Sequence, residues 1–199
     1  MIAQAKTKTA PKRYNSVAII LHWVMALAFF TMLGSGLAMT YLEFEDKQFQ
    51  FKLYQWHKAG GVLLLIAFVL RIGWRLATKV PKLPAKFSDL DKKLAKLGHW
   101  GLYFVMFAMP MTGWLMASSS QYGLPTIVFG WFEWPHMHEV IPSLAKIEAN
   151  ESIEGFAKDA HFYLAIAFGL MIAAHIIAVI KHIVKDNENL LPRMWWTKK

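Results

Sequence analysis

Histidines recur at matching depths along four apolar stretches of this sequence, and imidazole is the side chain most able to do chemistry there. His22, His57 and His99 each lie near the start of one of the first three stretches, and His161 and His175 lie on the fourth. An imidazole without a partner is costly in hydrocarbon, so repeated histidines inside a membrane indicate a buried iron or proton site. Neutral imidazole is a strong axial ligand for haem iron, and the pattern therefore predicts two b-type haems.

The spacing of these histidines suggests how they pair. His161 and His175 are fourteen residues apart, which on an α-helix is a rise of about 21 Å and nearly four full turns, so they share one face at opposite leaflets. Helices that alternate in direction put His22 and His99 near the cytoplasmic leaflet and His57 near the other. The simplest pairing is His22 with His175 for an inner haem and His57 with His161 for an outer haem. Two imidazoles leave iron no open position, which favours electron transfer over oxygen binding.

The composition limits which cofactors and folds are available. The chain has 199 residues, 56% of them hydrophobic, and it has no cysteine. Without cysteine there are no disulfides, no thiolate-bound iron–sulfur clusters and no covalent c-type haem, so any haem is held non-covalently. The long apolar blocks predict a single membrane domain.

The helices that must position the histidines can be placed from hydropathy. We expect an all-α, four-helix transmembrane bundle in which the first apolar run, at about 25 residues, is a retained helix and not a cleaved signal. The expected helices cover about 17–41, 54–75, 97–118 and 160–184, within a membrane domain over 14–185. A flexible basic arm over 1–13 precedes the domain, the basic segment 86–96 could lie on the inner surface, and a cytoplasmic tail over 186–199 follows.

The distribution of charge predicts the topology. The net charge is +9, and it is concentrated in the arm over 1–13, the segment over 71–96 and the chain from residue 181 onward, which together carry 17 Lys and Arg against 4 Asp and Glu. The other loops carry 5 against 9. Because basic loops stay on the cytoplasmic side, both termini are expected to face the cytoplasm. The positive charge is thus a topology signal, and no nucleic-acid partner is expected.

Several further polar residues allow two readings. Arg71 lies about one turn inside the membrane boundary and could pair with a haem propionate, as could Arg13 or Arg75, although anchoring at the inner headgroups also explains arginines there. His99 is left over after the pairing, and either faces a substrate near the inner haem or is simply packed. His182 could contact a propionate or a quinone, or could be an interfacial side chain.

Smaller signals also have two explanations. Gly60 and Gly61 follow His57, and Gly34 and Gly36 lie midway along the first helix, where a flat macrocycle needs clearance, but such glycines also let helices approach one another. Two loop histidines, His136 and His138, are expected to be solvated.

Taken together, the motifs resemble the bacterial cytochrome b561 proteins, which are small four-helix di-haem cytochromes of the inner membrane. The resemblance covers the chain from about Arg13 to Met194. The matching segments are Arg13-Tyr14, Ile20-Leu21-His22-Trp23, Trp56-His57-Lys58-Ala59-Gly60, Leu97-Gly98-His99-Trp100-Gly101-Leu102-Tyr103, Phe129-Gly130-Trp131-Phe132, Lys181-His182 and Asn189 to Met194.

The resemblance implies haem ligation by His22, His57, His161 and His175, in agreement with the depth argument. It also implies a quinone-linked oxidoreductase of the respiratory chain, in which His99 and His182 are candidates for quinone or proton handling. One type of family member oxidises superoxide at the outer face. The outer loops here are net negative and would not concentrate an anion, apart from a local patch of Lys47, Lys52 and Lys58, so generic electron transfer is the preferred reading.

Two other functions compete with a quinone-linked enzyme. The chain could be an electron-carrier subunit without a catalytic site, which docks a soluble redox partner on Trp131, Trp134 and the acidic outer loop. It could also transport a divalent metal through clustered histidines. A transport path should contain carboxylates, and Asp and Glu are absent from all four apolar cores, which disfavours transport.

Overall fold

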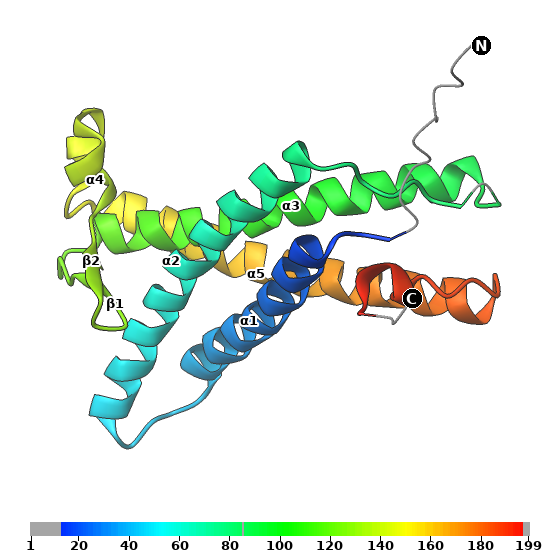
Figure 1. The fold of residues 1–199 in the computed structure, drawn as a ribbon. Helices are drawn as coiled ribbons and strands as arrows, with labels where there is room; N and C mark the ends of the chain where they lie inside the picture. The colour runs from blue at the N-terminus through cyan, green and yellow to red at the C-terminus, as the bar shows by residue number, and fades with distance from the viewer. Residues whose placement is uncertain (1–12, 85, 197–199) are drawn as a thin grey trace, which may run out of the picture.

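The structure, a computed structural model, describes residues 13–84 and 86–196 and is built around four long helices (Figure 1). These helices are α1 (Ser16–Tyr41), α2 (Lys47–Ala77), α3 (Asp89–Ser119) and α5 (Glu151–Val184). Each is long and apolar enough, by length and composition, to cross a membrane. The predicted helical fold with four membrane-crossing segments is confirmed. Most of the expected basic arm, residues 1–12, lies outside the described residues.

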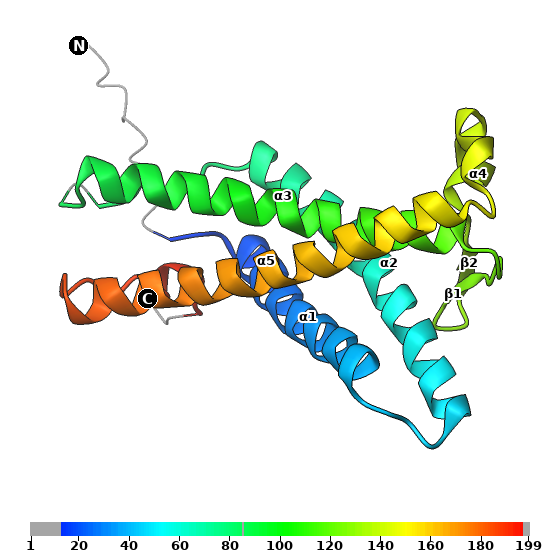
Figure 2. The ribbon, with the colours of Figure 1, turned by 180° about the vertical axis from the view of Figure 1, so that it is seen from behind.

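The four helices form two pairs. Helices α3 and α5 run side by side along most of their length, and α1 and α2 form a second pair that slants away from them (Figures 1 and 2). Helix α2 also contacts α3 and links the two pairs. The end of the bundle where α1 and α3 begin and α2 and α5 end is called the tail end below. The opposite end, which carries the strands, is called the hairpin end.

Each long helix begins at a polar capping residue. The side chains of Asn15, Asp46, Ser88 and Asn150 accept hydrogen bonds from backbone N–H groups in the first turns of α1, α2, α3 and α5. As a result α2, α3 and α5 begin at residues 47, 89 and 151, before the starts expected from hydropathy at 54, 97 and 160. Hydropathy detects only the part of a helix that suits hydrocarbon, whereas the caps fix where the helix begins. The segment expected on the inner surface, 86–96, is mostly the first two turns of α3.

The packing of the bundle is that of a membrane protein. Large apolar side chains point outward along its length, and Leu27, Phe104 and Leu170 are 70%, 65% and 67% exposed. The buried centre is small and lies between the two helix pairs. It consists of Met25, Phe29, Leu64, Val105 and Phe168. An apolar exterior around a small core is stable in lipid, where burial of apolar surface gives no driving force between helices.

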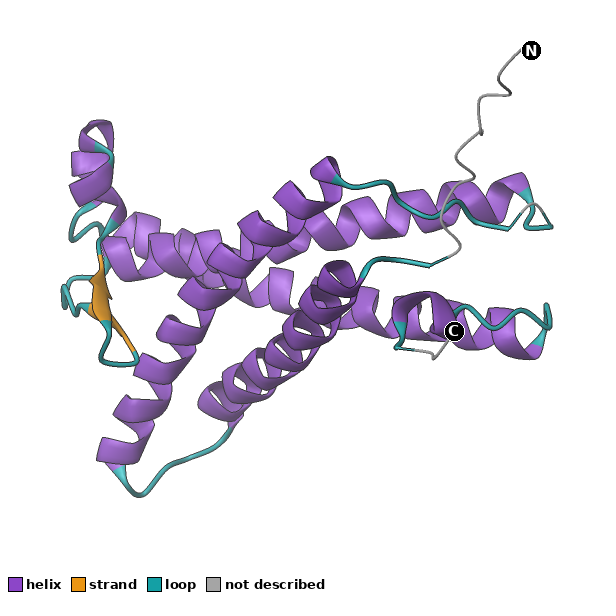
Figure 3. Ribbon diagram, in the orientation of Figure 1, coloured by secondary structure: helices purple, strands orange, loops and turns teal. Residues whose placement is uncertain are grey.

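The hairpin end is closed by the connection between α3 and α5, which holds the only strands among the described residues (Figure 3). Strand β1 (Thr126–Val128) pairs antiparallel with β2 (Phe132–Trp134), with Val128 opposite Phe132. Gly130, at φ 77°, occupies the turn in a conformation that glycine adopts without strain. Val128 packs on Ala59 and Val62 and so fixes the hairpin to α2. The short helices α4 (Met137–Val140) and η1 (Pro142–Ile147) complete this connection.

The tail end is tied together by the chain after α5, which includes the short helix η2 (Leu191–Met194). The Trp23 indole donates to the Met194 carbonyl at 2.7 Å, and the Tyr14 backbone N–H donates to the Arg193 carbonyl at 3.1 Å. Lys86 forms an ion pair with Glu188. The last segment of the chain is therefore joined to the start of α1 and to the loop before α3.

Candidate metal centres formed by paired histidines

At the hairpin end, His57 of α2 faces His161 of α5 between the two helix pairs. Their ring centroids are 6.2 Å apart and the ring planes cross at 72°. Both rings are half-buried. His57 and His161 are more than 100 residues apart in sequence, and the fold brings them together.

At the tail end, His22 of α1 faces His175 of α5. These ring centroids are 6.4 Å apart and the planes cross at 64°. His99 of α3 also reaches this site, with its centroid 5.8 Å from that of His175. The tail end thus holds three imidazoles, and the hairpin end holds two.

The separations within the two pairs can be compared with what one metal ion requires. Two imidazoles on opposite sides of an ion place their ring centroids about 6.3 Å apart if each metal–nitrogen bond is about 2.0 Å. The values of 6.2 Å and 6.4 Å match this spacing, whereas the 5.8 Å between His99 and His175 is shorter. The donor sets are two neutral nitrogens each, which suits iron in a porphyrin. The residues present therefore fit a haem at each end.

Hydroxyl groups contact both hairpin-end histidines on the ring nitrogen Nδ1. Ser35 Oγ, on α1, lies 2.8 Å from His57 Nδ1. Thr112 Oγ1, on α3, lies 3.0 Å from His161 Nδ1. Each hydroxyl thus reaches a histidine on the other helix of its own pair. Contacts of this kind fix the orientation of a ligand imidazole and decide which nitrogen carries its proton.

A glycine follows each of these hydroxyl residues and faces the same histidine. A Cβ on Gly36 would lie 3.5 Å from His57 Cε1, and one on Gly113 would lie 3.3 Å from His161 Cε1. The first distance is an ordinary contact, and the second would crowd the ring. Each glycine therefore lets the neighbouring histidine ring lie close to the helix, and at Gly113 a larger residue would crowd that ring. Gly34, for which clearance and close helix approach were both open, has no atom within 4 Å of its Cβ position, so no close approach requires a glycine there.

The tail-end site carries positive charge. The Arg71 guanidinium donates from Nη2 to His22 Nδ1 at 3.2 Å and lies 5.8 Å from the centre of the Tyr103 ring. Its Nε is buried and has no hydrogen-bond partner among the described residues. Arg75 also lies over Tyr103, at 5.3 Å. The ion pairs of the described residues include neither arginine, so this site suits an anionic group such as a propionate.

The bond from Arg71 also has a consequence for His22. An imidazole that accepts at Nδ1 while neutral carries its proton on Nε2. Binding a metal through Nε2 requires that proton to move to Nδ1, which then no longer accepts from the guanidinium. Metal binding at His22 would therefore release Arg71 to an anionic partner.

His99 differs from the other helix histidines because its side chain is exposed at the surface of the bundle. Its Nδ1–H donates to the Ala95 carbonyl at 2.5 Å, which leaves Nε2 unprotonated in the neutral ring. His99 thus lies at the surface of the bundle, in ring contact with His175.

His182, the other candidate for proton handling, lies apart from the three tail-end imidazoles. Its ring packs edge-to-face on Phe87 at 4.7 Å, and Nδ1–H donates to Asp186 at 2.5 Å. Lys181 lies 3.1 Å from the same carboxylate. Two hydrogen bonds hold the pKa of Asp186 below its usual value. The one from His182 has the larger effect and the one from Lys181 the smaller. His182 therefore belongs to the ion pairs of the tail.

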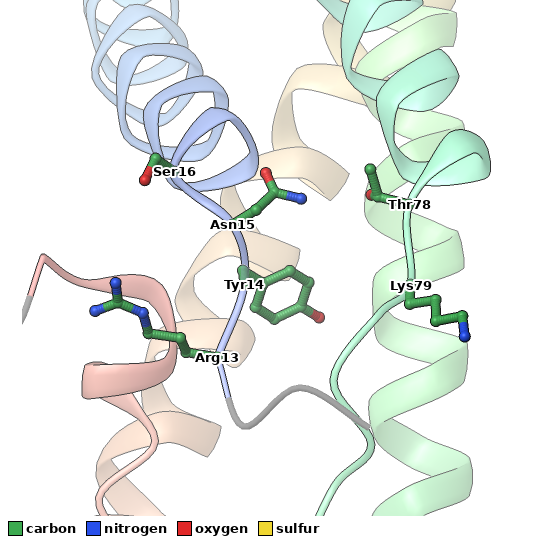
Figure 4. Close-up of a pocket in the computed structure, with 6 residues that line it drawn as sticks. All are labelled: Arg13, Tyr14, Asn15, Ser16, Thr78 and Lys79. Carbon is green, nitrogen blue, oxygen red and sulfur yellow. The ribbon is translucent and has the colours of Figure 1, made fainter. Parts of the chain in front are cut away.

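Arg13 lines a surface pocket of about 390 Å³ between the start of α1 and the end of α2 (Figure 4). The Arg13 and Tyr14 side chains point to opposite sides of the chain there. The pocket is lined by Arg13, Tyr14, Asn15, Ser16, Thr78 and Lys79. No histidine lines it, so it is distinct from both histidine sites.

The two loop histidines stack on each other instead of standing free in solvent. The rings of His136 and His138 are 5.4 Å apart and nearly parallel. Both are half-buried, and His138 Nδ1 is buried without a partner among the described residues. His136 is the N-cap of α4 and His138 lies within it, at the hairpin end, and they contribute to neither histidine pair.

Sequence reasoning found the histidines and Arg71 but missed Ser35, Thr112 and Gly113. The signal that would have found them is a hydroxyl residue followed by glycine inside an apolar helix, which occurs as Ser35-Gly36 and again as Thr112-Gly113.

Comparison with known proteins supplies independent information. The family model for prokaryotic cytochrome b561 matches residues 13–197. The chain is 31% identical over 184 residues to "cytochrome b561 homolog 2" of Escherichia coli (strain K12), covering 92% of each protein. It is 26% identical over 188 residues to the "probable superoxide oxidase CybB" of Yersinia pestis, covering 94% of this chain and 98% of that protein.

Proposed function

The chain belongs to the prokaryotic cytochrome b561 family, and on this premise we propose that it holds two b-type haems and carries single electrons between a donor at the hairpin end and the quinone pool. The family is one of bacterial membrane proteins that transfer electrons and bind b-type haem. What the proposal adds is the number of haems, their ligands and the two electron partners.

The observation that carries the proposal is the pairing of four histidines at two depths. His57 with His161 and His22 with His175 have ring separations that are compatible with ligation of one iron by each pair. A bound haem would supply reversible one-electron chemistry at its iron. The four imidazoles would hold the two haems, and Arg71 would neutralise a propionate at the tail end. A haem held by two imidazoles would favour electron transfer over oxygen binding.

The direction across the membrane follows from charge. The loops at the tail end carry most of the Lys and Arg, so the tail end with both termini faces the cytoplasm and the hairpin end faces outward. We assign the protein to the bacterial inner membrane, in which basic loops are kept on the cytoplasmic side. His22 and His175 would then hold the inner haem, and His57 and His161 the outer haem.

Quinone exchange is assigned to the tail end because His99 lies at the surface of the bundle and close to His175. Reduction of a quinone takes up protons as well as electrons. His99, near the cytoplasmic boundary, is the side chain that would pass a proton to a quinone there. His182 would serve the reaction only indirectly, because it is paired with Asp186.

The experiment that tests the proposal is a haem count on purified full-length protein expressed with ample haem. We expect two b-type haems per chain. His57→Ala and His161→Ala should each remove the same haem, and His22→Ala and His175→Ala the other. His136→Ala, a histidine outside both pairs, is the matched control and should keep two. A colourless wild-type protein, or loss of the same haem in all four variants, would contradict the proposal.

A second candidate function is that of an electron carrier for a separate redox protein. The feature that favours it is Trp131, which is 75% exposed at the tip of the hairpin, where a partner could dock. One experiment separates the two functions. If the purified protein alone catalyses repeated electron transfer from superoxide to a quinone, the protein is an enzyme. If it stays oxidised until a reduced soluble partner is added, and Trp131→Ala weakens that reaction, it is a carrier.

A further inference from the structure

The hydroxyl groups beside His57 and His161 donate their protons to backbone carbonyls of their own helices. Ser35 donates to the Met32 carbonyl at 3.0 Å, and Thr112 donates to the Met109 carbonyl at 2.8 Å. With the hydroxyl proton on the helix carbonyl, the oxygen is free to accept from the histidine. This arrangement favours the tautomer with a proton on Nδ1 of each histidine and a free lone pair on Nε2.

The same arrangement occurs on both sides of the hairpin-end site. Ser35 of α1 acts on His57 of α2, and Thr112 of α3 acts on His161 of α5. At the tail end the partners are of another kind, since His22 Nδ1 accepts from the charged Arg71. The hydroxyl partners thus favour metal binding through Nε2 at the two hairpin-end histidines. At His22 the partner on Nδ1 is a guanidinium, which favours a proton on Nε2 instead.

A simpler explanation for these hydroxyls is that serine and threonine inside a helix commonly bond to a carbonyl of the preceding turn. Thr31 and Thr40 of α1 do this, donating to the Leu27 and Gly36 carbonyls. Both are exposed, and their hydroxyls contact no histidine among the described residues. Ser35 and Thr112 make the same helix bond and, in addition, accept from an imidazole. The second contact sets them apart, and Thr31 provides the control.

We propose that Ser35 and Thr112 are positioning residues that set the proton position and the donor strength of the hairpin-end haem ligands. This inference rests on the proposed function. A hydrogen bond from Nδ1–H makes an imidazole a stronger ligand, and a stronger neutral donor stabilises ferric over ferrous iron. The two hydroxyls therefore lower the reduction potential of the hairpin-end haem and leave the tail-end haem unaffected.

The test is a redox titration of full-length Ser35→Ala, Thr112→Val, Thr31→Ala and wild-type protein. The hairpin-end haem is identified as the one that is missing in His57→Ala. In Ser35→Ala and in Thr112→Val we expect its potential to rise, with up to a tenfold change in its reduction equilibrium, or about 59 mV for one electron. We also expect its affinity for the protein to fall about tenfold. The tail-end haem should titrate as in wild type.

Conservative variants and a control separate the effect of the hydroxyl group from the effect of substituting the residue. Ser35→Thr and Thr112→Ser keep a hydroxyl and should restore the wild-type potential, and Thr31→Ala should not change it. Loss of only the hairpin-end haem in Ser35→Ala, regained in Ser35→Thr, also supports the inference. Potentials in Ser35→Ala and Thr112→Val equal to those of Thr31→Ala, equal shifts in both haems, or no rescue would overturn it. If wild-type protein bound no haem, the proposed function itself would fail.

Discussion

Phe29 and Phe168 meet edge-to-face at the centre of the bundle, with ring centroids 4.8 Å apart. Phe168 is seven residues from His161 and seven from His175, so it lies midway between the two histidine sites along α5. Phe29 lies seven residues from His22 on α1. Seven residues are about 10.5 Å of helix, so this aromatic pair fills the space between the two proposed haems.

Replacing Phe168 with alanine should slow electron transfer between the haems without removing either one. Truncation leaves a cavity between the sites while the four histidines keep their positions. We expect a loss of stability below the about 3–5 kcal/mol of soluble cores, because the side chain stays in hydrocarbon when the helices separate. Flash-induced kinetics of haem-to-haem transfer are the measurement, with Phe162→Ala, on the exposed side of α5, as the control. Unchanged kinetics in Phe168→Ala would show that this ring pair is only packing.

Alanine at Gly113 should weaken haem binding at the hairpin end. The added methyl would lie 3.3 Å from His161 Cε1 and turn the ring away from His57. Gly34→Ala is the matched control, because nothing lies within 4 Å of its Cβ position. In that variant the gain in helix propensity, about 0.5–1 kcal/mol, should be the main effect. Haem content per chain is measured, and equal content in the two variants would refute the crowding argument.

Arg71→Gln should lower the reduction potential of the tail-end haem. A nearby cation favours the reduced state because it stabilises the added electron, and glutamine removes that charge while it keeps hydrogen-bonding groups. Arg71→Lys keeps the charge but lacks the planar guanidinium. Its reduction potential should therefore lie between that of Arg71→Gln and that of wild type. Lys92→Gln removes a charge that is paired with Asp89 at the start of α3 and serves as the control. A shift of equal size in Lys92→Gln would mean that only overall charge matters.

Acid should release the chain after α5. The pKa of Asp186 is lowered by its hydrogen bonds from His182 and Lys181, and Lys181 also contacts Asp91 at 3.1 Å. A lowered carboxyl pKa contributes stability that is present above the ordinary pKa of about 4 and is lost as pH falls through the folded value. Amide-exchange protection of residues 187–196 should therefore fall below about pH 4.

The matching variant is Asp186→Asn, in which this protection should already be reduced at neutral pH. Asp89→Asn, which removes only an exposed carboxylate paired with Lys92, is the control. Equal protection in the two variants at neutral pH would show that Asp186 does not hold the tail.

The sequence alone determined the helical class, the four membrane-crossing segments and the position of each histidine along its helix. These properties are local, because hydropathy is read over about twenty consecutive residues and the helical repeat fixes how far apart His161 and His175 lie. The absence of cysteine restricted the haem type in the same direct way. The helix starts were less accessible, because Asp46, Ser88 and Asn150 cap the helices outside the apolar stretches.

Only the tertiary structure decided which side chains act on the histidines. Ser35 and His57 are 22 residues apart, and Thr112 and His161 are 49 apart, on helices that meet through packing. Whether a hydroxyl faces an imidazole depends on how each helix is rotated about its axis and how closely it approaches its neighbour. That rotation is set by the fit of side chains such as Phe29 against Phe168 across the bundle, and no local pattern in the sequence encodes it.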